Sequence, residues 1–155
     1  MMKFVWLVPV ALYGQTLQVQ SEPGADGHSG RVVIRLDSPP GKEPVALQWD
    51  LEFAATALHV DLTNPAAGDA AKTAGKSVAC SLIAREKIDR FRYRCILAGG
   101  VSVIASGPIV TLPYSAEQNA KPGRYPLRLK NGLSVSKNLK KDKLKDSGVE
   151  ITLSK

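Results

Sequence analysis

Residue types on which many enzymes depend are scarce in this chain, which has two histidines and two cysteines among 155 residues. It contains no Gly-x-Ser-x-Gly, no phosphate-binding glycine loop and no His-Glu-x-x-His. The usual signatures of hydrolases, nucleotide-binding proteins and metalloproteases are therefore missing. No histidine lies near either cysteine in the sequence, which disfavours a zinc site. We predict no catalytic residue, no cofactor and no metal site.

Long hydrophobic runs are also missing, because none approaches the roughly 20 apolar residues of a transmembrane helix. The apolar run at residues 4–13 follows Lys3 and precedes Gly14. A short apolar run behind a positive charge is typical of an export signal, with a buried N-terminal strand as the alternative. We predict a signal peptide over residues 1–14 and a mature domain over 15–155. The protein would then be secreted or periplasmic, without a membrane anchor.

Aromatic residues make up 6% of the chain, whereas the formal net charge is +7. Much of the positive excess comes from Lys137, Lys140, Lys141, Lys143 and Lys145. This run carries no aromatic side chains and is interrupted by Asp142 and Asp146. Proteins that bind single-stranded nucleic acid combine basic grooves with aromatic stacking residues. We therefore interpret the run as a solvated loop and predict no nucleic-acid partner.

Alternation of apolar and polar residues is the dominant pattern, and its longest run is Val45, Leu47, Trp49, Leu51 and Phe53. This period of two predicts a half-buried strand, with Asp50 and Glu52 on its exposed face. Shorter runs of the same kind occupy residues 17–19, 32–36, 58–62, 77–84, 90–97, 101–105, 109–112, 125–135 and 149–153. About nine short strands separated by turn residues predict an all-β sandwich.

Two segments between these strands carry further expectations. Asn131-Gly132 is typical of a two-residue hairpin turn, because both central residues of such a turn need positive φ. We therefore expect residues 125–129 and 133–135 to form a hairpin. Residues 65–75 are rich in alanine and glycine and are expected to form a loop.

The two cysteines fall on two neighbouring predicted strands. A symmetric turn at residues 86–89 would pair positions whose numbers sum to 175. The pairs are then Cys80 with Cys95, Leu82 with Tyr93, and Ala84 with Phe91, all on one apolar face. An even cysteine count in an exported protein also favours a disulfide. We predict a Cys80–Cys95 disulfide and a core that contains it together with Trp49, Phe53, Phe91 and Tyr93.

Two stretches of the sequence resemble a cohesin domain. GRVVIRLDS at 30–38, a Pro/Gly loop, ALQWDLEF at 46–53 and LHV at 58–60 resemble its opening half. PGRYPLRLKNG at 122–132 is similar to its late Gly-x-Tyr-Pro hairpin. The resemblance covers about residues 16–153 and departs from the family in the cysteine hairpin and the alanine-rich loop. It implies a nine-stranded jelly-roll sandwich, a fold shared with several cellulose-binding modules.

The resemblance also implies a function, because cohesins bind dockerin modules of enzymes through one flat sheet. That sheet includes the strand corresponding to 46–53, which would expose Gln48 and Asp50 beside Arg92 and Arg94. The expected function is a secreted, non-catalytic module that binds a dockerin-like extracellular protein.

Two alternatives stay open at the level of the sequence. One is a carbohydrate-binding module acting in polysaccharide breakdown, with a polysaccharide as partner. Sugar rings stack on exposed aromatic side chains, and after Trp49 is assigned to the core, Tyr114 and Tyr125 are the candidates. The other alternative is a structural component of an envelope or secretion assembly.

Overall fold

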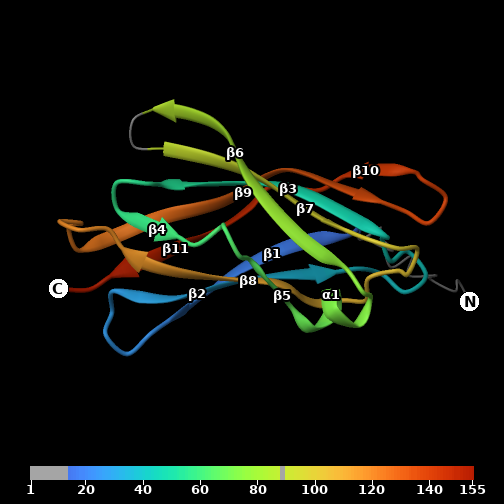
Figure 1. Ribbon diagram of the computed structural model, residues 1–155, viewed down its shortest axis with the longest axis horizontal. Helices are drawn as coiled ribbons and strands as arrows, with labels where there is room; N and C mark the ends of the chain where they lie inside the picture. Colours follow the sequence, from blue (N-terminus) through green and yellow to red (C-terminus); the bar gives the residue numbers. More distant parts are fainter. Residues whose placement is uncertain (1–13, 88–89) are drawn as a thin grey trace, which may run out of the picture.

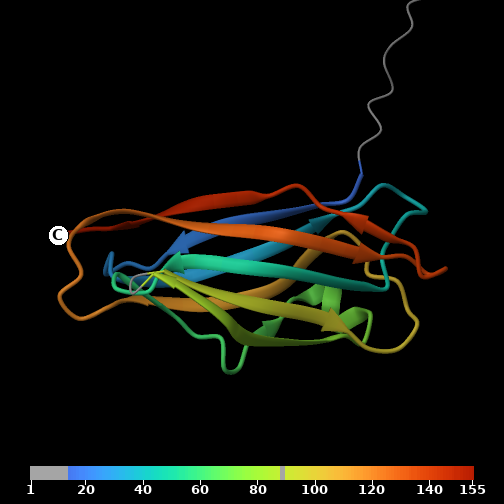
Figure 2. The same cartoon turned by 90° about the horizontal axis from the view of Figure 1, so that it is seen from above.

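The computed structural model describes residues 14–87 and 90–155. Two antiparallel sheets pack against each other, and their strands run along the long axis of the molecule (Figures 1 and 2). The prediction of an all-β jelly-roll sandwich is confirmed. Residues 1–13 of the predicted signal peptide lie outside the described residues, as do residues 88–89 of the predicted turn. No helix in the described ranges is long and apolar enough to cross a membrane.

The smaller sheet has five strands in the order β1-β2-β8-β4, with β5 pairing along another part of β8. Its strands are β1 (Thr16–Pro23), β2 (Ser29–Asp37), β4 (Leu58–Val60), β5 (Ala66–Ala67) and β8 (Gly107–Ala116). The short helix α1 (Asp69–Thr73) follows β5 and packs near β8.

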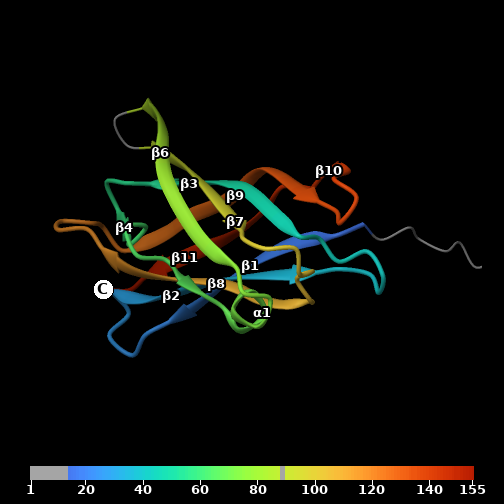
Figure 3. The ribbon, with the colours of Figure 1, turned by 45° about the vertical axis from the view of Figure 1, so that its right-hand side comes forward.

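The larger sheet has six strands in the order β10-β9-β3-β7-β6, with β11 pairing along another part of β9. Its strands are β3 (Ala46–Ala54), β6 (Ser77–Lys87), β7 (Arg90–Ala98), β9 (Gly123–Val135), β10 (Lys141–Lys143) and β11 (Ser147–Leu153). The hairpin of β6 and β7 extends beyond the neighbouring strands at one side of the sandwich (Figures 1 and 3).

The core lies between the sheets and is built from the inward positions of each strand. In β3 these positions are Leu47, Trp49, Leu51 and Phe53, all buried. They meet inward residues of the smaller sheet such as Ile34 and Leu112, which are fully buried. The alternation of β3 therefore identifies its core face, as predicted.

The β6–β7 pair confirms the predicted register near the cysteines. Cys80 lies opposite Cys95 and Leu82 opposite Tyr93. Beyond Leu82 the register shifts, so Ala84 pairs with Arg92 and not, as predicted, with Phe91. Irregularities of this kind insert an extra residue into one strand. A sum rule for a regular hairpin cannot anticipate them.

Phe91 also departs from the predicted core. Its ring is only partly buried, and the Arg85 guanidinium lies 5.2 Å from the ring centroid. Tyr93 is partly buried and stacks on Phe53, with ring centroids 5.9 Å apart. Phe91 is the second residue of β7, near the end of the β6–β7 hairpin, and it is of intermediate burial. This end of the hairpin passes beyond the area that the smaller sheet covers (Figure 3).

The predicted hairpin turn at Asn131-Gly132 is wrong, because β9 continues without a turn from Gly123 to Val135. Along β3, Gln48 pairs with Leu133 and Asp50 with Lys130, so Asn131 and Gly132 together lie opposite one residue, Trp49. This is a β-bulge, and Asn131 has a φ of 53°. Asn-Gly supplies positive φ to a bulge as readily as to a turn.

Two loop assignments also change. Residues 101–105 form no strand, but Ile104 is fully buried and its N–H donates to the Pro44 carbonyl at 2.8 Å. The segment 65–75 is not a simple loop, because it contains β5 and α1, with Ala71 fully buried. Gly68 lets this segment approach β8: a Cβ at that position would lie 2.5 Å from the Pro108 carbonyl group. Small residues here serve close packing.

Candidate functional site

The face of the larger sheet that points away from the core collects the residues predicted to bind a partner. We define the outer face as the outward side chains of β9, β3, β7 and β6. Its basic half contains Asp50, Glu52, Arg90, Arg92, Arg94, Arg128 and Lys130. Its apolar half contains Ala46, Gln48, Ala79, Ile96, Ala98 and Leu133. The strand pairing thus brings Gln48 next to Ile96 and Asp50 next to Arg94.

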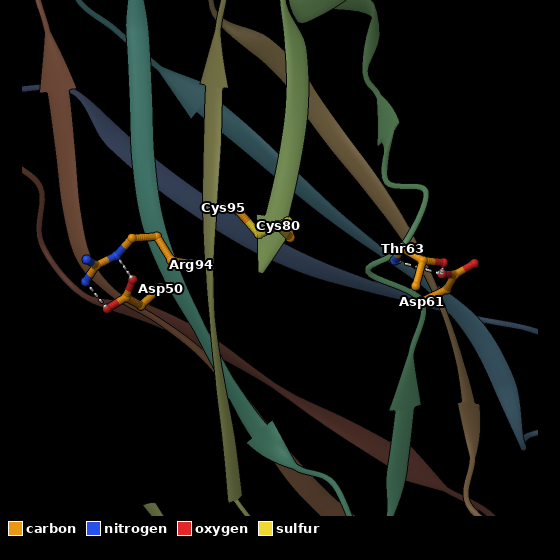
Figure 4. The surroundings of a disulfide bond; sticks show 6 residues. All are labelled: Asp50, Asp61, Thr63, Cys80, Arg94 and Cys95. Atoms are coloured by element: carbon orange, nitrogen blue, oxygen red, sulfur yellow. Dashed lines mark hydrogen bonds and ion pairs between the residues drawn. A yellow bond between two sulfur atoms is a disulfide. The ribbon is translucent and has the colours of Figure 1, made fainter. Parts of the chain in front are cut away.

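Asp50 is 0% exposed, although it lies on the outer face. Arg94 donates to its carboxylate twice, from Nε to Oδ1 at 2.8 Å and from Nη2 to Oδ2 at 3.1 Å (Figure 4). Asn131 Nδ2 donates to Oδ2 at 2.9 Å. Burial raises the pKa of the Asp50 carboxyl, but these hydrogen bonds outweigh it and the net shift is downward. Asp50 is therefore a buried carboxylate in its charged form.

Glu52 is 3% exposed and lies within 4 Å of three cations. Its carboxylate oxygens lie 3.5 Å from Arg90, 3.2 Å from Arg92 and 3.4 Å from Lys130. Burial raises the pKa of the Glu52 carboxyl, whereas the hydrogen bond from Arg92 and the charge of Lys130 lower it. The lowering effects are larger, so the net shift of this pKa is downward. A second carboxylate is thus held charged beneath basic side chains.

The expectation that Asp50 and Glu52 are exposed is wrong. Arg94 and Lys130 flank Asp50 on the neighbouring strands, and Arg92 and Arg128 flank Glu52. Long basic side chains cover neighbouring surface with their stems while their charged ends reach water, so they shield the short carboxylates. Gln48 is half-buried. Gln48, Asp50, Arg92 and Arg94 lie on one face of the sheet, as expected. The exposed groups of that face are the arginines, whereas the Asp50 carboxylate is buried.

The apolar half of the outer face has one strongly exposed large side chain. Ile96 is 46% exposed, and its pairing partners Gln48 and Ala79 are a half-buried amide and a single methyl group. Ile96 lies close to arginine side chains, and arginine is among the residues enriched at protein interfaces.

The Cys80–Cys95 disulfide is confirmed, and it joins edge strand β6 to β7 (Figure 4). Cys95 is fully buried. A recess of about 430 Å³ lies beside the cystine, with Val60, Leu62 and Leu82 among its lining residues. At its rim, the Asp61 carboxylate accepts hydrogen bonds from the backbone N–H of Thr63 at 3.1 Å and its hydroxyl at 2.8 Å. These contacts close a local turn.

Lys76 was not singled out from the sequence, yet it is 5% exposed. Its ammonium donates to the Gly99 carbonyl at 2.6 Å and to the Gly100 carbonyl at 3.4 Å. Burial lowers the pKa of Lys76. The residue holds the loop after β7 against the start of β6. Nothing in the local sequence around Lys76 indicates this long-range contact.

The described residues contain no group of three or more His, Cys, Asp or Glu side chains that could hold a metal ion. His59 Nδ1 lies 3.6 Å from Glu117, and both side chains are exposed. His28 belongs to the β1–β2 loop, where its backbone N–H donates to Asp26 at 3.0 Å.

Comparisons with known proteins place the fold. No family model matches the chain, and no curated protein matches it by sequence. Among solved structures, the chain is similar to a type I cohesin–dockerin complex from Clostridium thermocellum, with a TM-score of 0.65 and 18% identity. This match covers 89% of the chain and 99% of the other.

Two further cohesin structures agree. One is the sixth cohesin of Acetivibrio cellulolyticus scaffoldin B in complex with a mutant dockerin, with a TM-score of 0.64, 14% identity and coverage of 88% and 98%. The other is a cohesin module from a Clostridium perfringens family 33 glycoside hydrolase, with a TM-score of 0.64, 11% identity and coverage of 90% and 96%. The chain therefore has the fold of cohesin modules, as its sequence resemblance implied.

Proposed function

We propose that this chain is a non-catalytic, protein-binding module that uses its outer face. The observation that carries the proposal is the whole-domain likeness to cohesins solved in complex with dockerins. A dockerin-like module is accordingly the class of partner we propose. The disulfide is consistent with a role outside the cytoplasm, because disulfides persist in oxidising compartments.

The composition of the outer face supports its assignment as the binding surface. It combines arginine side chains with an exposed isoleucine, whereas the other face of the same sheet forms the core. Arginine is enriched at protein interfaces. Burial of an exposed apolar group beneath a partner is favourable and stabilises the complex.

No observation favours the carbohydrate alternative. Trp49 and Tyr114 are 0% and 4% exposed, so neither can stack on a sugar ring. Tyr125 is half-buried and its hydroxyl donates to the Lys121 carbonyl at 2.5 Å. Of the two tyrosines that are stacking candidates, Tyr114 is thus buried, and Tyr125 is tied to the backbone at Lys121.

The test is capture of proteins from the producing cell's secreted and envelope fraction with immobilised residues 15–155. Ile96→Asn removes the exposed apolar side chain of the outer face. Leu139→Asn is the matched control, because Leu139 is an exposed apolar residue in the β9–β10 connection. Loss of a specific protein with Ile96→Asn but not with Leu139→Asn supports the proposal. Equal capture by the unmodified domain, Ile96→Asn and Leu139→Asn contradicts the proposal, as does the absence of any captured protein.

A further inference from the structure

We propose that the partner presents an acidic protein surface to the basic half of the outer face. This inference rests on the proposed function and goes beyond it by naming the chemistry of the partner. It follows from how the charges of the face are divided between buried and exposed groups.

The carboxylates of the face are buried, whereas its cations are exposed. The basic half holds five cations, namely Arg90, Arg92, Arg94, Arg128 and Lys130, against the two carboxylates Asp50 and Glu52, which leaves three positive charges. Asp50 and Glu52 are 0% and 3% exposed, but the side chains of their four basic partners are 22–43% exposed. Within the basic half, an approaching protein therefore meets guanidinium and ammonium groups before either carboxylate. The exposed carboxylate of Glu150, on the adjacent strand β11, is paired with Arg124 at 3.8 Å.

Two of these cations, Arg94 and Arg128, keep N–H donors available after the bonds found among the described residues are made. A guanidinium has five N–H donors. Arg94 commits Nε and one Nη2 hydrogen to Asp50, so three of its donors are left. Arg128 is exposed and lies opposite Glu52 in the register. No ion pair to Arg128 is found among the described residues, which leaves its whole guanidinium for an external carboxylate.

The buried carboxylates also fix the geometry of the face. Asp50 holds Arg94 through two parallel hydrogen bonds, and Glu52 holds Arg92 and Lys130. Arginine side chains carry considerable conformational entropy, and a side chain that is already ordered loses less of it on binding. The internal ion pairs therefore prepare the arginines to bind acidic groups.

The neighbouring apolar half favours a protein over other polyanions. Ile96 is 46% exposed beside the basic half, so an apolar patch on a protein partner can cover it. No described residue of the outer face is aromatic, so bases and sugar rings find no stacking surface there. A nucleic acid or acidic polysaccharide is a competing outcome of the test.

The experiment compares charge reversal on the two sheets. Arg128→Glu reverses a charge on the outer face, and Arg35→Glu makes the same change on β2 of the smaller sheet. Thermal unfolding first verifies that both variants are folded. The wild type and both variants then capture proteins from the same secreted and envelope fraction, and the captured protein is produced and titrated by calorimetry. Lys130 is coupled to partner carboxylates with a zero-length carbodiimide cross-linker.

We expect Arg128→Glu to weaken binding by about tenfold or more and Arg35→Glu to leave it within about twofold. Binding should weaken as NaCl rises from about 50 to about 300 mM, because salt screens exposed charges. Cross-links should join Lys130 to Asp or Glu of the partner.

Two sets of contrary results are distinguishable. A protein whose capture requires Ile96, but which binds Arg128→Glu as well as wild type, overturns the acidic partner and leaves the proposed function intact. Capture of a nucleic acid or polysaccharide in place of a protein overturns both, as does capture of nothing.

Discussion

The side-chain amide of Asn131 donates a hydrogen bond of 2.9 Å to Asp50 from within the bulge of β9. The bulge inserts Asn131 and Gly132 opposite the single residue Trp49, and Asn131 takes a φ of 53°. Asn131 therefore has two roles. It adopts a backbone conformation that is unfavourable for most residues, and its side-chain amide donates a hydrogen bond to a buried carboxylate.

Two substitutions at residue 131 should separate these roles. Asn131→Gly keeps the positive φ accessible and removes the hydrogen bond, so we expect the free energy of unfolding to fall by about 1–2 kcal/mol. Asn131→Ala also forces an alanine into positive φ and should cost about 1 kcal/mol more. Urea unfolding measures both. Equal stability of the two variants would show that the backbone conformation is not under constraint.

Removal of the Arg94 side chain should leave Asp50 poorly compensated. We expect Arg94→Met to lower the free energy of unfolding by about 1–3 kcal/mol and to raise the pKa of Asp50. Arg128→Met is the control, since Arg128 is exposed, and should change stability by less than about 0.5 kcal/mol. NMR titration of the Asp50 carboxyl carbon provides the second readout. An unchanged pKa of Asp50 in Arg94→Met would contradict the assigned hydrogen bonds.

Stability should decrease in acid because of Asp50 and Glu52. The pKa of each carboxyl is lower in the folded than in the unfolded chain, so the unfolded state binds protons first. Their contribution is complete above the unfolded pKa values, near pH 4, and is lost as pH falls through the folded values. Unfolding followed between about pH 7 and pH 2 should show this loss. The loss should shrink in an Asp50→Asn/Glu52→Gln variant; an identical acid profile would exclude these two groups as its source.

The disulfide should contribute substantially to stability. Cys80 and Cys95 are separated by 15 residues, and a cross-link that closes a loop of this size contributes about 3 kcal/mol in the chain-entropy model. We expect Cys80→Ser to lower the melting temperature under oxidising conditions and to make it independent of added reductant. The wild type should lose stability when dithiothreitol is added. A wild-type melting temperature that ignores dithiothreitol would contradict the expectation.

The features that the sequence predicted correctly depend on local periodicity. The run at 45–53 alternates without interruption, and β3 buries one set of its side chains as expected. The Cys80–Cys95 pairing follows from the same period applied to a hairpin. Ala84 and Phe91 depart from the predicted pairing, because the register shifts after Leu82, and the alternation of apolar and polar residues does not indicate where a strand pair shifts its register.

The features that the sequence did not predict depend on contacts between distant residues. Asn131-Gly132 is compatible with both a turn and a bulge, and the pairing with β3 selects the bulge. Asp50 has the polarity of a surface residue, and its burial results from Arg94 and Asn131, which are 44 and 81 residues away in sequence. The sequence could therefore predict that Gln48, Asp50, Arg92 and Arg94 share one sheet face, but not which of their groups form its surface.

The position of the cystine has a mechanical consequence. β6 is the outermost strand of the larger sheet and, within the described part of the chain, pairs only with β7. A load applied to a partner bound on the outer face would tend to peel that strand away, one hydrogen bond after another. Because a covalent bond joins Cys80 to Cys95 within the strand pair, peeling must stop there. The sheet can thus resist tension at the margin where hydrogen bonds alone would yield first.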